Sequence, residues 1–271
     1  MELLRPSDLE ELKGGLLIAG GTEVVPQLRE GLLRAETLVD ITEIVPRGIE
    51  GTRIGAGATL AEVEAASQLP EVLREACRLA ASPQLRNMGS IGGNLLQSTR
   101  CWYWRLSYPC RLHGGERCHA KEGEHREHAI FANDFCASAH PSDVAAALVA
   151  LGATIRTNRR ELAVHELYRL ADESDRRTTT LGTGEVMLEL EVPPAEASVY
   201  LKAMDRKRWA FPLVGVAGVR RGTVTTLALA GVAPIPWLLD GPLDEATPLR
   251  DTAYKVEIAR ALVARAIAKL G

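Results

Sequence analysis

Four of the five cysteines in this chain fall between positions 101 and 136, where their thiolates could gather around a metal or redox group. They are Cys101, Cys110, Cys118 and Cys136, spaced C-x8-C-x7-C-x17-C. A structural zinc site usually includes a tight C-x2–4-C pair, and this pattern has none. The wide spacing favours a folded excursion that brings four thiolates around iron and sulfide. Two alternatives stay open: nearby histidines could join the ligands, or the segment is a surface insertion without metal.

A glycine-rich segment directly before the cysteines has the residues that bind phosphate. Within residues 89–94, three glycines permit close approach of a ligand to the backbone, and Ser90 and Asn94 add side-chain donors. A second turn, Gly20-Gly21-Thr22-Glu23, precedes an expected helix, so its N–H groups could face an anion. The run Gly55-Ala-Gly57 lacks the third glycine and the acidic residue of a Rossmann fingerprint. Two phosphate-binding turns together favour a dinucleotide outside the Rossmann class.

Composition limits the class of protein and its partners. The chain has 271 residues, is 46% hydrophobic and 25% charged, and carries a net charge of −3, as a globular protein would. The small net charge gives no reason to expect nucleic acid or an anionic membrane as partner. No apolar run reaches the roughly 18–20 residues of a membrane span, so we expect no membrane partner. The charged N-terminus does not resemble a signal peptide, so we expect a cytoplasmic protein, or one exported only with a partner. In a chain without a signal peptide, clustered cysteines favour metal or redox use over disulfides.

The first half of the chain alternates short strands and helices. A capping box formed by Thr59 and Glu62 predicts a helix to about Ser67. A helix over 71–81 places Cys77 on its apolar stripe, where an inert buried thiol is expected. The other elements expected here are helices over 5–13 and 23–29 and strands over 16–19, 37–41 and 52–56.

The second half changes character after residue 185. Ser142 is expected to cap a helix over 143–151 that ends at Gly152, followed by strands over 153–157 and 162–164. A polar, Gly-rich linker covers 178–185. Short apolar runs with turns between them then predict an antiparallel meander and a last helix over 252–270, which Asp251 would cap. The meander strands are expected over 186–192, 198–204, 213–220 and 224–232. This order predicts an α+β fold class.

Four stretches resemble the FAD-binding medium subunits of the molybdenum hydroxylases, the family of xanthine dehydrogenase and carbon monoxide dehydrogenase. They are Ala19–Glu23, Gln84–Asn94, Ser142-Asp143 before an Ala-rich helix, and Tyr200–Ala217. The resemblance implies a two-subdomain, PCMH-like FAD-binding domain over residues 1–175, divided at about 53/54. A CO-dehydrogenase-flavoprotein-like α+β domain of antiparallel strands and a helix would follow over 176–271.

The resemblance also implies which residues bind FAD. Both glycine turns would hold the pyrophosphate through backbone N–H groups, Asp143 would hydrogen-bond near the ribityl or ring portion, and Lys202 would lie near the flavin. The positions implied are Ala19, Gly20, Gly21, Thr22, Glu23, Asn87, Gly89, Ser90, Ile91, Gly92, Gly93, Asn94, Asp143 and Lys202.

The excursion over about 98–140 is similar to those of periplasmic aldehyde oxidoreductase flavin subunits and of 4-hydroxybenzoyl-CoA reductase. This implies a 4Fe–4S cluster held by Cys101, Cys110, Cys118 and Cys136 close to the FAD. Arginines beside these cysteines could offset the cluster's charge, or they are solvated surface residues.

The resemblance further implies an electron-transfer subunit of a heterotrimer. A large molybdopterin-binding subunit would oxidise the substrate, a small 2Fe–2S subunit would pass electrons to this chain, and an external acceptor would remove them. No residue of this chain is expected to be catalytic toward the organic substrate. The alternatives are a stand-alone FAD oxidoreductase of the vanillyl-alcohol-oxidase-like class and a zinc-stabilised assembly protein.

Overall fold

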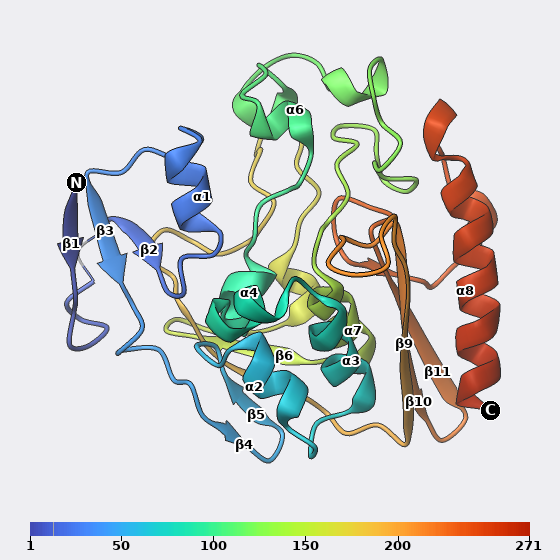
Figure 1. Ribbon diagram of the computed structural model, residues 1–271, viewed down its shortest axis with the longest axis horizontal. Helices are drawn as coiled ribbons and strands as arrows, with labels where there is room; N and C mark the ends of the chain where they lie inside the picture. Colours follow the sequence, from blue (N-terminus) through green and yellow to red (C-terminus); the bar gives the residue numbers. More distant parts are fainter. Residues whose placement is uncertain (13) are drawn as a thin grey trace.

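A small parallel sheet forms one side of the molecule. The computed structural model describes residues 1–12 and 14–271. Strands β1 (Glu2–Leu4), β3 (Thr37–Asp40) and β2 (Leu16–Ile18) lie side by side in that order (Figure 1). Helix α1 (Val24–Arg29) lies in the connection from β2 to β3, because parallel neighbours need a crossover rather than a tight turn. The turn 20–23 therefore sits where β2 ends and α1 begins.

The helix expected over 5–13 does not form in the described part of the chain. Residues 8–11 make a turn in which Asp8 Oδ1 accepts hydrogen bonds from the N–H groups of Glu10 and Glu11. This local side-chain bonding competes with a helix. The last position of the expected helix, Lys13, lies outside the described residues.

The second sheet is antiparallel and joins distant parts of the chain. Its order is β4 (Ile49–Glu50), β5 (Arg53–Gly55), β8 (Met187–Glu191), β6 (Thr154–Thr157) and β7 (Glu161–Ala163). The prediction that residues 186–192 begin the C-terminal meander is therefore wrong. Leu190 of β8 pairs with Ile54 on one side and Ile155 on the other, and all three side chains are buried. Burial of this apolar row decides where β8 pairs.

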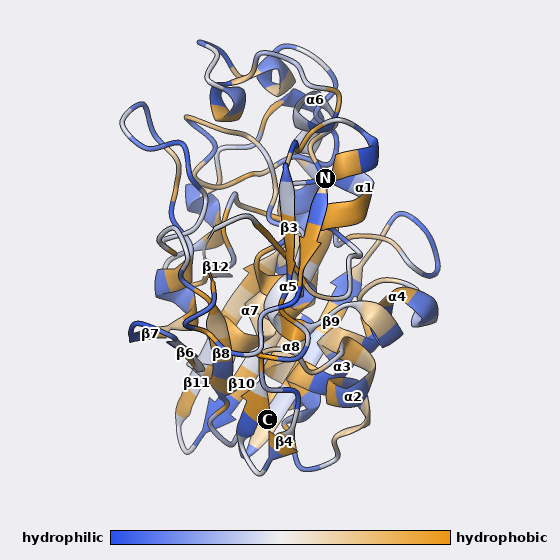
Figure 2. Cartoon of the chain, turned by 90° about the vertical axis from the view of Figure 1, so that its left-hand side faces the viewer, coloured by the Kyte–Doolittle hydropathy of each residue, from blue (hydrophilic) through white to orange (hydrophobic). Residues whose placement is uncertain are grey.

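Helix α7 (Asp143–Leu151) lies at the centre of the fold. All nine of its residues are buried, as expected for a helix that is hydrophobic all round. On one side it packs against helices α3 (Glu71–Leu79) and α5 (Ile91–Leu95). On the other side it packs against the C-terminal sheet described below (Figures 1 and 2). Both predicted end signals are confirmed: the N–H of Ala145 donates to Ser142 Oγ, and Gly152 ends the helix at φ 62°.

Four further helices surround α7 and the cavity described below. They are α2 (Leu60–Ala65), α3 (Glu71–Leu79), α4 (Pro83–Met88) and α5 (Ile91–Leu95). The predicted capping box of α2 is present in both directions between Thr59 and Glu62. Cys77 of α3 is fully buried in the core, as predicted.

The C-terminal part is a four-stranded antiparallel sheet covered by one long helix. The strand order is β12 (Trp237–Leu238), β11 (Val224–Ala230), β10 (Val214–Arg221) and β9 (Ala197–Ala203). Helix α8 (Tyr254–Leu270) packs on β9 and β10. Asp251 does not cap this helix, because a short 3-10 turn (Arg250–Thr252) precedes it and the Asp251 carboxylate binds Arg250.

The cysteine-bearing excursion projects at one end of the molecule, around α6 (Trp102–Arg105) in Figure 1. It is mostly irregular, with short 3-10 turns over Arg111–His113 and His119–Lys121. Further 3-10 turns in the described part of the chain span Val164–Leu167 and Leu243–Glu245. The N–H groups of Ile130 and Phe131 donate to Val232 O at 2.7 and 2.9 Å, so the excursion is fastened to the C-terminal sheet.

The mixture of antiparallel sheets and packed helices confirms the predicted α+β class. The division into domains at 175/176 stays a prediction, because the two halves share one hydrophobic core that includes Tyr200 and Val219. Within the described residues, no helix has the length and hydrophobicity needed to cross a bilayer.

The buried imidazole of His140 predicts acid sensitivity. Burial lowers its pKa from 6.5 to about 3, so the folded protein keeps it neutral while the unfolded chain binds a proton below pH 6.5. Since the unfolded state binds more protons in that window, this group should lower stability by about 1.4 kcal/mol per pH unit as pH falls from 6.5 toward 3. We expect His140→Asn to flatten the acid dependence of the unfolding free energy, measured in urea between about pH 7 and about pH 5.

The exposed His165 supplies the control, and His165→Asn should keep the wild-type slope. Equal slopes for the wild type and the His140 variant would contradict the prediction.

Candidate functional site

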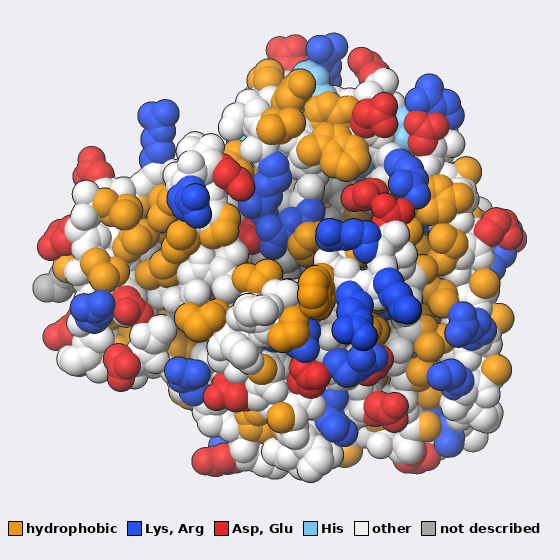
Figure 3. Space-filling model, in the orientation of Figure 1, with side chains coloured by type: hydrophobic (Ala, Val, Ile, Leu, Met, Phe, Trp, Pro, Cys, Tyr) orange, Lys and Arg blue, Asp and Glu red, His pale blue; other side chains and the backbone are white. Residues whose placement is uncertain are grey.

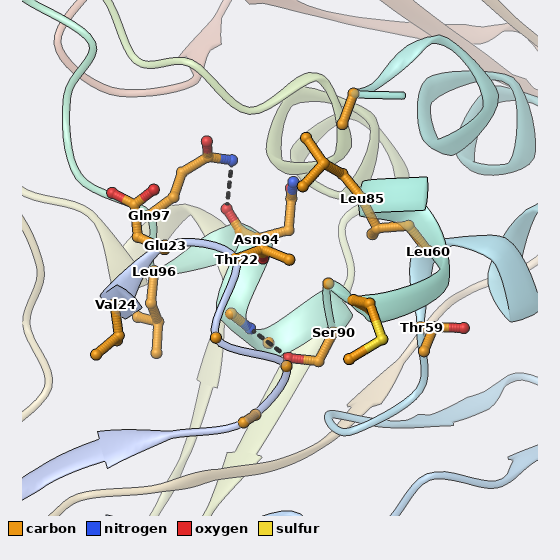
Figure 4. Close-up of a pocket in the computed structure, with 18 of the residues that line it drawn as sticks. Thr22, Glu23, Val24, Thr59, Leu60, Leu85, Ser90, Asn94, Leu96 and Gln97 are labelled. Atoms are coloured by element: carbon orange, nitrogen blue, oxygen red, sulfur yellow. Dashed lines mark hydrogen bonds between the residues drawn. The ribbon is translucent and has the colours of Figure 1, made fainter. Parts of the chain in front are cut away.

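A cavity of about 650 Å³ lies beside the first sheet, and residues of α2, α4 and α5 line it (Figure 4). Its wall contains all but two of the positions expected to bind FAD. The lining positions are Ala19, Gly20, Gly21, Thr22, Glu23, Asn87, Gly89, Ser90, Gly92, Gly93, Asn94 and Asp143. The exceptions are Ile91, which is buried in the core, and Lys202, which reaches the wall only through Asp143. Tertiary structure thus brings both glycine turns to one cavity.

The first glycine turn touches the second directly. A Cβ at position 20 would lie 1.7 Å from Met88 O, so only glycine lets the two turns approach this closely. Gly21 has φ 71°, which also favours glycine. Among the described residues, no group accepts a hydrogen bond from the N–H groups of Gly20 to Val24. Several free donors at the edge of the cavity suit an anion.

The second glycine segment contributes differently from what the sequence suggested. Ser90 caps α5 by accepting the N–H of Gly93 at 3.1 Å (Figure 4). The N–H groups of Ile91 and Gly92 donate to backbone carbonyls at 2.8 and 2.9 Å. The N–H groups of Gly92 and Gly93 are thus satisfied within the protein, and their binding to phosphate stays a prediction. These residues shape the wall, since a Cβ at Gly92 would lie 3.0 Å from Ala56 O.

Glu23 holds the excursion against the first glycine turn. Its carboxylate accepts hydrogen bonds from Arg100 and Arg105, both at 2.7 Å, and from the N–H of Ser98 at 3.1 Å. Its side chain is only 17% exposed, so these charge-assisted bonds are partly shielded from water. The two arginines also neutralise a carboxylate that would otherwise repel an anion in the cavity. Arg100 and Arg105 are therefore neither solvated surface residues nor free partners for a cluster.

A chain of hydrogen bonds continues from Arg100 along the cavity wall. Arg100 donates to Gln97 Oε1 at 2.8 Å, and Gln97 donates to Asn94 O at 2.8 Å (Figure 4). Asn94 Oδ1 accepts the hydroxyl of Ser142 at 2.6 Å, and Ser142 caps α7. Asn94 thus fastens the second glycine segment to the central helix.

Asp143 is the buried acid of the site. It accepts hydrogen bonds from Lys202 Nζ at 2.8 Å and from the Tyr200 hydroxyl at 2.5 Å. The side chains of Asp143 and Lys202 are 3% and 0% exposed. Burial raises the pKa of Asp143, and the ammonium and hydroxyl oppose that shift. Lys202 also donates to Leu79 O at 3.0 Å, so it positions Asp143 rather than facing the cavity.

An apolar rim completes the cavity, and sequence reasoning did not assign it. Trp209 and Phe211 line the wall from the loop after β9 and are about half exposed, and Leu85 and Met88 line it from α4. The Arg100 guanidinium lies 5.0 Å from the centre of the Phe211 ring. Aromatic and apolar groups beside a set of N–H donors suit a ligand with a flat ring and phosphates. Basic side chains gather near the centre of the face in Figure 3.

The four excursion cysteines are free thiols with unequal surroundings. The Cys136 thiol donates to Ser138 Oγ at 3.3 Å. Its interaction with Cys118 lowers the pKa of Cys118 to about 5 and raises the pKa of Cys136. Burial raises the pKa of Cys101 to about 11. Nearby backbone N–H groups favour the thiolate at two of the sulfurs: those of Tyr103 and Trp104 oppose the rise in the pKa of Cys101, and those of Ala120, Lys121 and Ala137 help to lower the pKa of Cys118. Such donors stabilise thiolates that bind a metal or cluster.

Within residues 1–12 and 14–271, no group of three or more His, Cys, Asp or Glu side chains is arranged around one point to hold a metal ion.

Two further arginines beside the cysteines differ in role: Arg111 stabilises the excursion, and Arg117 lies at the surface. Arg111 donates to the carbonyls of Asp134 and Phe135 at 3.1 and 3.2 Å. Arg117 is exposed and lies 3.8 Å from Glu122.

A second cavity, of about 270 Å³, lies between the first cavity and the excursion. Cys101, Trp102 and His128 line it on the excursion side. It shares four wall residues with the larger cavity: Arg100, Pro141, Ala210 and Phe211.

Comparison with known proteins matches this architecture. Residues 3–195 match the family model described as the FAD binding domain in molybdopterin dehydrogenase, a match that extends through β8. The aldehyde oxidoreductase FAD-binding subunit PaoB of Escherichia coli K12 is 32% identical over 250 residues, which cover 85% of this chain and 79% of PaoB. The carbon monoxide dehydrogenase medium chain of Hydrogenophaga pseudoflava is 39% identical over 88 residues, 29% of this chain and 30% of that relative.

Solved structures share the fold over the whole chain. One chain of carbon monoxide dehydrogenase from Hydrogenophaga pseudoflava superposes with a TM-score of 0.72 at 22% identity, covering 100% of this chain and 96% of that one. A chain of quinoline 2-oxidoreductase from Pseudomonas putida 86 gives a TM-score of 0.69 at 16% identity, with the same coverage.

The buried pair of Asp143 and Lys202 should behave as a unit in unfolding. Lys202→Met leaves a buried carboxylate without its counter-ion, and loss of one partner of such a pair costs about 3–5 kcal/mol. The double variant Asp143→Asn/Lys202→Met should lose less than Lys202→Met alone, because no charge then stays unpaired. Urea unfolding of the single and double variants measures both effects.

The exposed pair of Arg260 and Asp244 serves as control, and Arg260→Met should leave stability nearly unchanged. A double variant less stable than Lys202→Met would contradict the assignment.

Proposed function

Because the chain belongs to the family of FAD-binding domains in molybdopterin dehydrogenases, we propose that it is the FAD-carrying electron-transfer subunit of a molybdopterin-dependent hydroxylase or aldehyde oxidoreductase complex. The observation that carries this proposal is the pair of glycine turns, in direct contact, on one 650 Å³ cavity. Bound FAD would couple one-electron iron–sulfur carriers to a two-electron acceptor. The chain itself binds and orients that group.

The residues present fit FAD. In this proposal the free N–H groups from Gly20 to Val24 hold the pyrophosphate, and Ser90 and Asn94 shape the facing wall. Asp143 hydrogen-bonds near the ribityl or ring portion, and Lys202 fixes its position. The remaining proposed FAD-binding positions, namely Ala19, Asn87, Gly89, Ile91, Gly92 and Gly93, support these turns. The apolar rim suits the flavin ring. Residues 1–175, completed by β8, form the proposed FAD-binding unit, and β9 to α8 form the second.

We also propose that Cys101, Cys110, Cys118 and Cys136 hold a 4Fe–4S cluster. The support is the set of four cysteines within one excursion, together with backbone N–H groups that favour the thiolate at Cys101 and Cys118, since amide donors to sulfur are typical of cluster thiolates. The Cys118–Cys136 contact brings two of the four sulfurs together. The excursion starts at the end of the second glycine segment, so a cluster there would lie beside the FAD cavity.

The proposed partners are the other subunits of such a complex. PaoB is named as a subunit of an aldehyde oxidoreductase, and the carbon monoxide dehydrogenase relative is named as a medium chain. By analogy we propose a heterotrimer in which a molybdopterin-binding large subunit oxidises the substrate and a small subunit with 2Fe–2S clusters passes electrons to this chain. An external acceptor then removes them. The proposed compartment is the cytoplasm, or the periplasm after export with a partner.

FAD binding should depend on the glycine at position 20. Gly20→Ala places a methyl group against Met88 O and forces the two glycine turns apart. We expect bound FAD, measured by absorbance and by release of the flavin after denaturation, to fall at least about tenfold while the chain stays folded.

Gly48→Ala is the matched control, because a Cβ there meets nothing within 4 Å and its φ is not positive. If Gly20→Ala retains as much FAD as Gly48→Ala, the two turns do not form the binding site.

Iron content tests the cluster separately. Cys110→Ser and Cys118→Ser should each reduce iron per chain to background in protein purified without oxygen, and FAD should remain. Cys77→Ala changes a buried cysteine outside the excursion and should leave both cofactors in place. Iron unchanged in both serine variants would refute the ligand assignment, and zinc in place of iron would favour the assembly-protein alternative.

A further inference from the structure

The side chain of His128 faces the sulfur of Cys101. Its Nε2 lies 3.2 Å from Cys101 Sγ, and the imidazole is only 3% exposed. Its Nδ1 is buried and has no hydrogen-bond partner among the described residues. The ring packs edge-on against Trp102, with centroids 5.4 Å apart and planes at 74°. Within the described structure, the imidazole of His128 therefore has one hydrogen-bond partner, the sulfur of Cys101.

A buried ammonium fixes the backbone that carries His128. Lys255 of α8 has no exposed surface, and its Nζ donates to Glu127 O, His128 O and Gly231 O at 2.7, 2.9 and 2.9 Å. All three of its donors are used, and they join the excursion to the end of β11. The imidazole is thus held from both its backbone and its ring, which leaves little freedom to turn away from Cys101.

Cys101 is also the excursion cysteine that lines the cavity adjoining the FAD cavity. It lines the second cavity, and Cys110, Cys118 and Cys136 do not. That cavity shares Arg100 and Phe211 with the larger one. A group bound through Cys101 would therefore face the flavin side of the excursion.

We propose that His128 donates its Nε2–H to Cys101 Sγ and thereby raises the reduction potential of the iron–sulfur group that Cys101 holds; this inference rests on the proposed cluster. A ligating thiolate has no proton to share, so the imidazole must be the donor. The unpaired Nδ1 then carries only a lone pair, which costs less to bury than an unpaired N–H. A hydrogen bond to a ligand sulfur withdraws electron density and favours the reduced cluster. His128 acts as a positioning and tuning residue, without direct contact to FAD.

The test compares the full chain, loaded with iron and FAD, with three variants. His128→Leu removes the donor, whereas His128→Gln keeps an N–H group of similar reach. His119→Leu is the matched control, because His119 belongs to the same aromatic cluster and makes no hydrogen bond to a sulfur in the described structure. The readouts are iron per chain and the midpoint potential from an EPR-monitored redox titration.

We expect His128→Leu to lower the reduction equilibrium constant of the cluster about tenfold, which is about 59 mV for one electron. His128→Gln and His119→Leu should keep the wild-type potential. A wild-type potential in iron-loaded His128→Leu would overturn the inference and leave the cluster standing. If His128→Leu fails to hold iron, His128→Gln decides: a wild-type potential supports the donor role and a lowered one overturns it. A wild-type chain without iron would instead refute the proposed cluster.

Discussion

The burial of one carboxylate, Asp143, is the constraint on which the rest of this structure depends. It begins α7, the helix that both halves of the molecule pack against, and it lines the larger cavity, where FAD is proposed to bind. A buried charge is tolerated only when it is paired and hydrogen-bonded. Lys202 and Tyr200 meet that requirement from β9, so the C-terminal sheet must close over α7. The acid that the resemblance places beside the flavin also joins the two halves.

Glu23 makes a comparable connection on the other side of the cavity. An acid at the start of α1 would oppose phosphate binding if it were free. Here its charge is taken up by Arg100 and Arg105, which come from the start of the excursion. The same ion pairs therefore remove a repulsive charge from the anion site and hold the cysteine-bearing segment against it. Glu23 thus links the proposed flavin site to the placement of the excursion.

These links suit the proposed role of the chain as an electron-transfer subunit. The larger and the smaller cavity share wall residues, and Cys101 lines the smaller one. Lys255 and the hydrogen bonds to Val232 fix the excursion to the C-terminal sheet. If the proposed cluster and FAD are bound, this rigid placement keeps them at a constant separation, so electron transfer between them needs no domain movement.

The sequence alone determined the features that depend on neighbouring residues. Helix caps at Thr59 and Ser142, the stop at Gly152 and the strand–turn–helix at Gly20 are local, because each satisfies backbone groups within a few residues. These signals predicted the α+β class and both glycine turns of the site, and the quoted motifs pointed to the family.

Tertiary structure decided whatever depends on residues far apart in the chain. Strand β8 joins β5 and β6 because the apolar row of Leu190 can be buried there, and its own sequence does not name that partner. The N–H groups of Gly92 and Gly93 are used within the protein, and Glu23 pairs with arginines about 80 positions away. The contact of His128 with Cys101 spans 27 positions. Local patterns define elements, but pairing of buried charges, donors and apolar rows is settled only when the whole chain has packed.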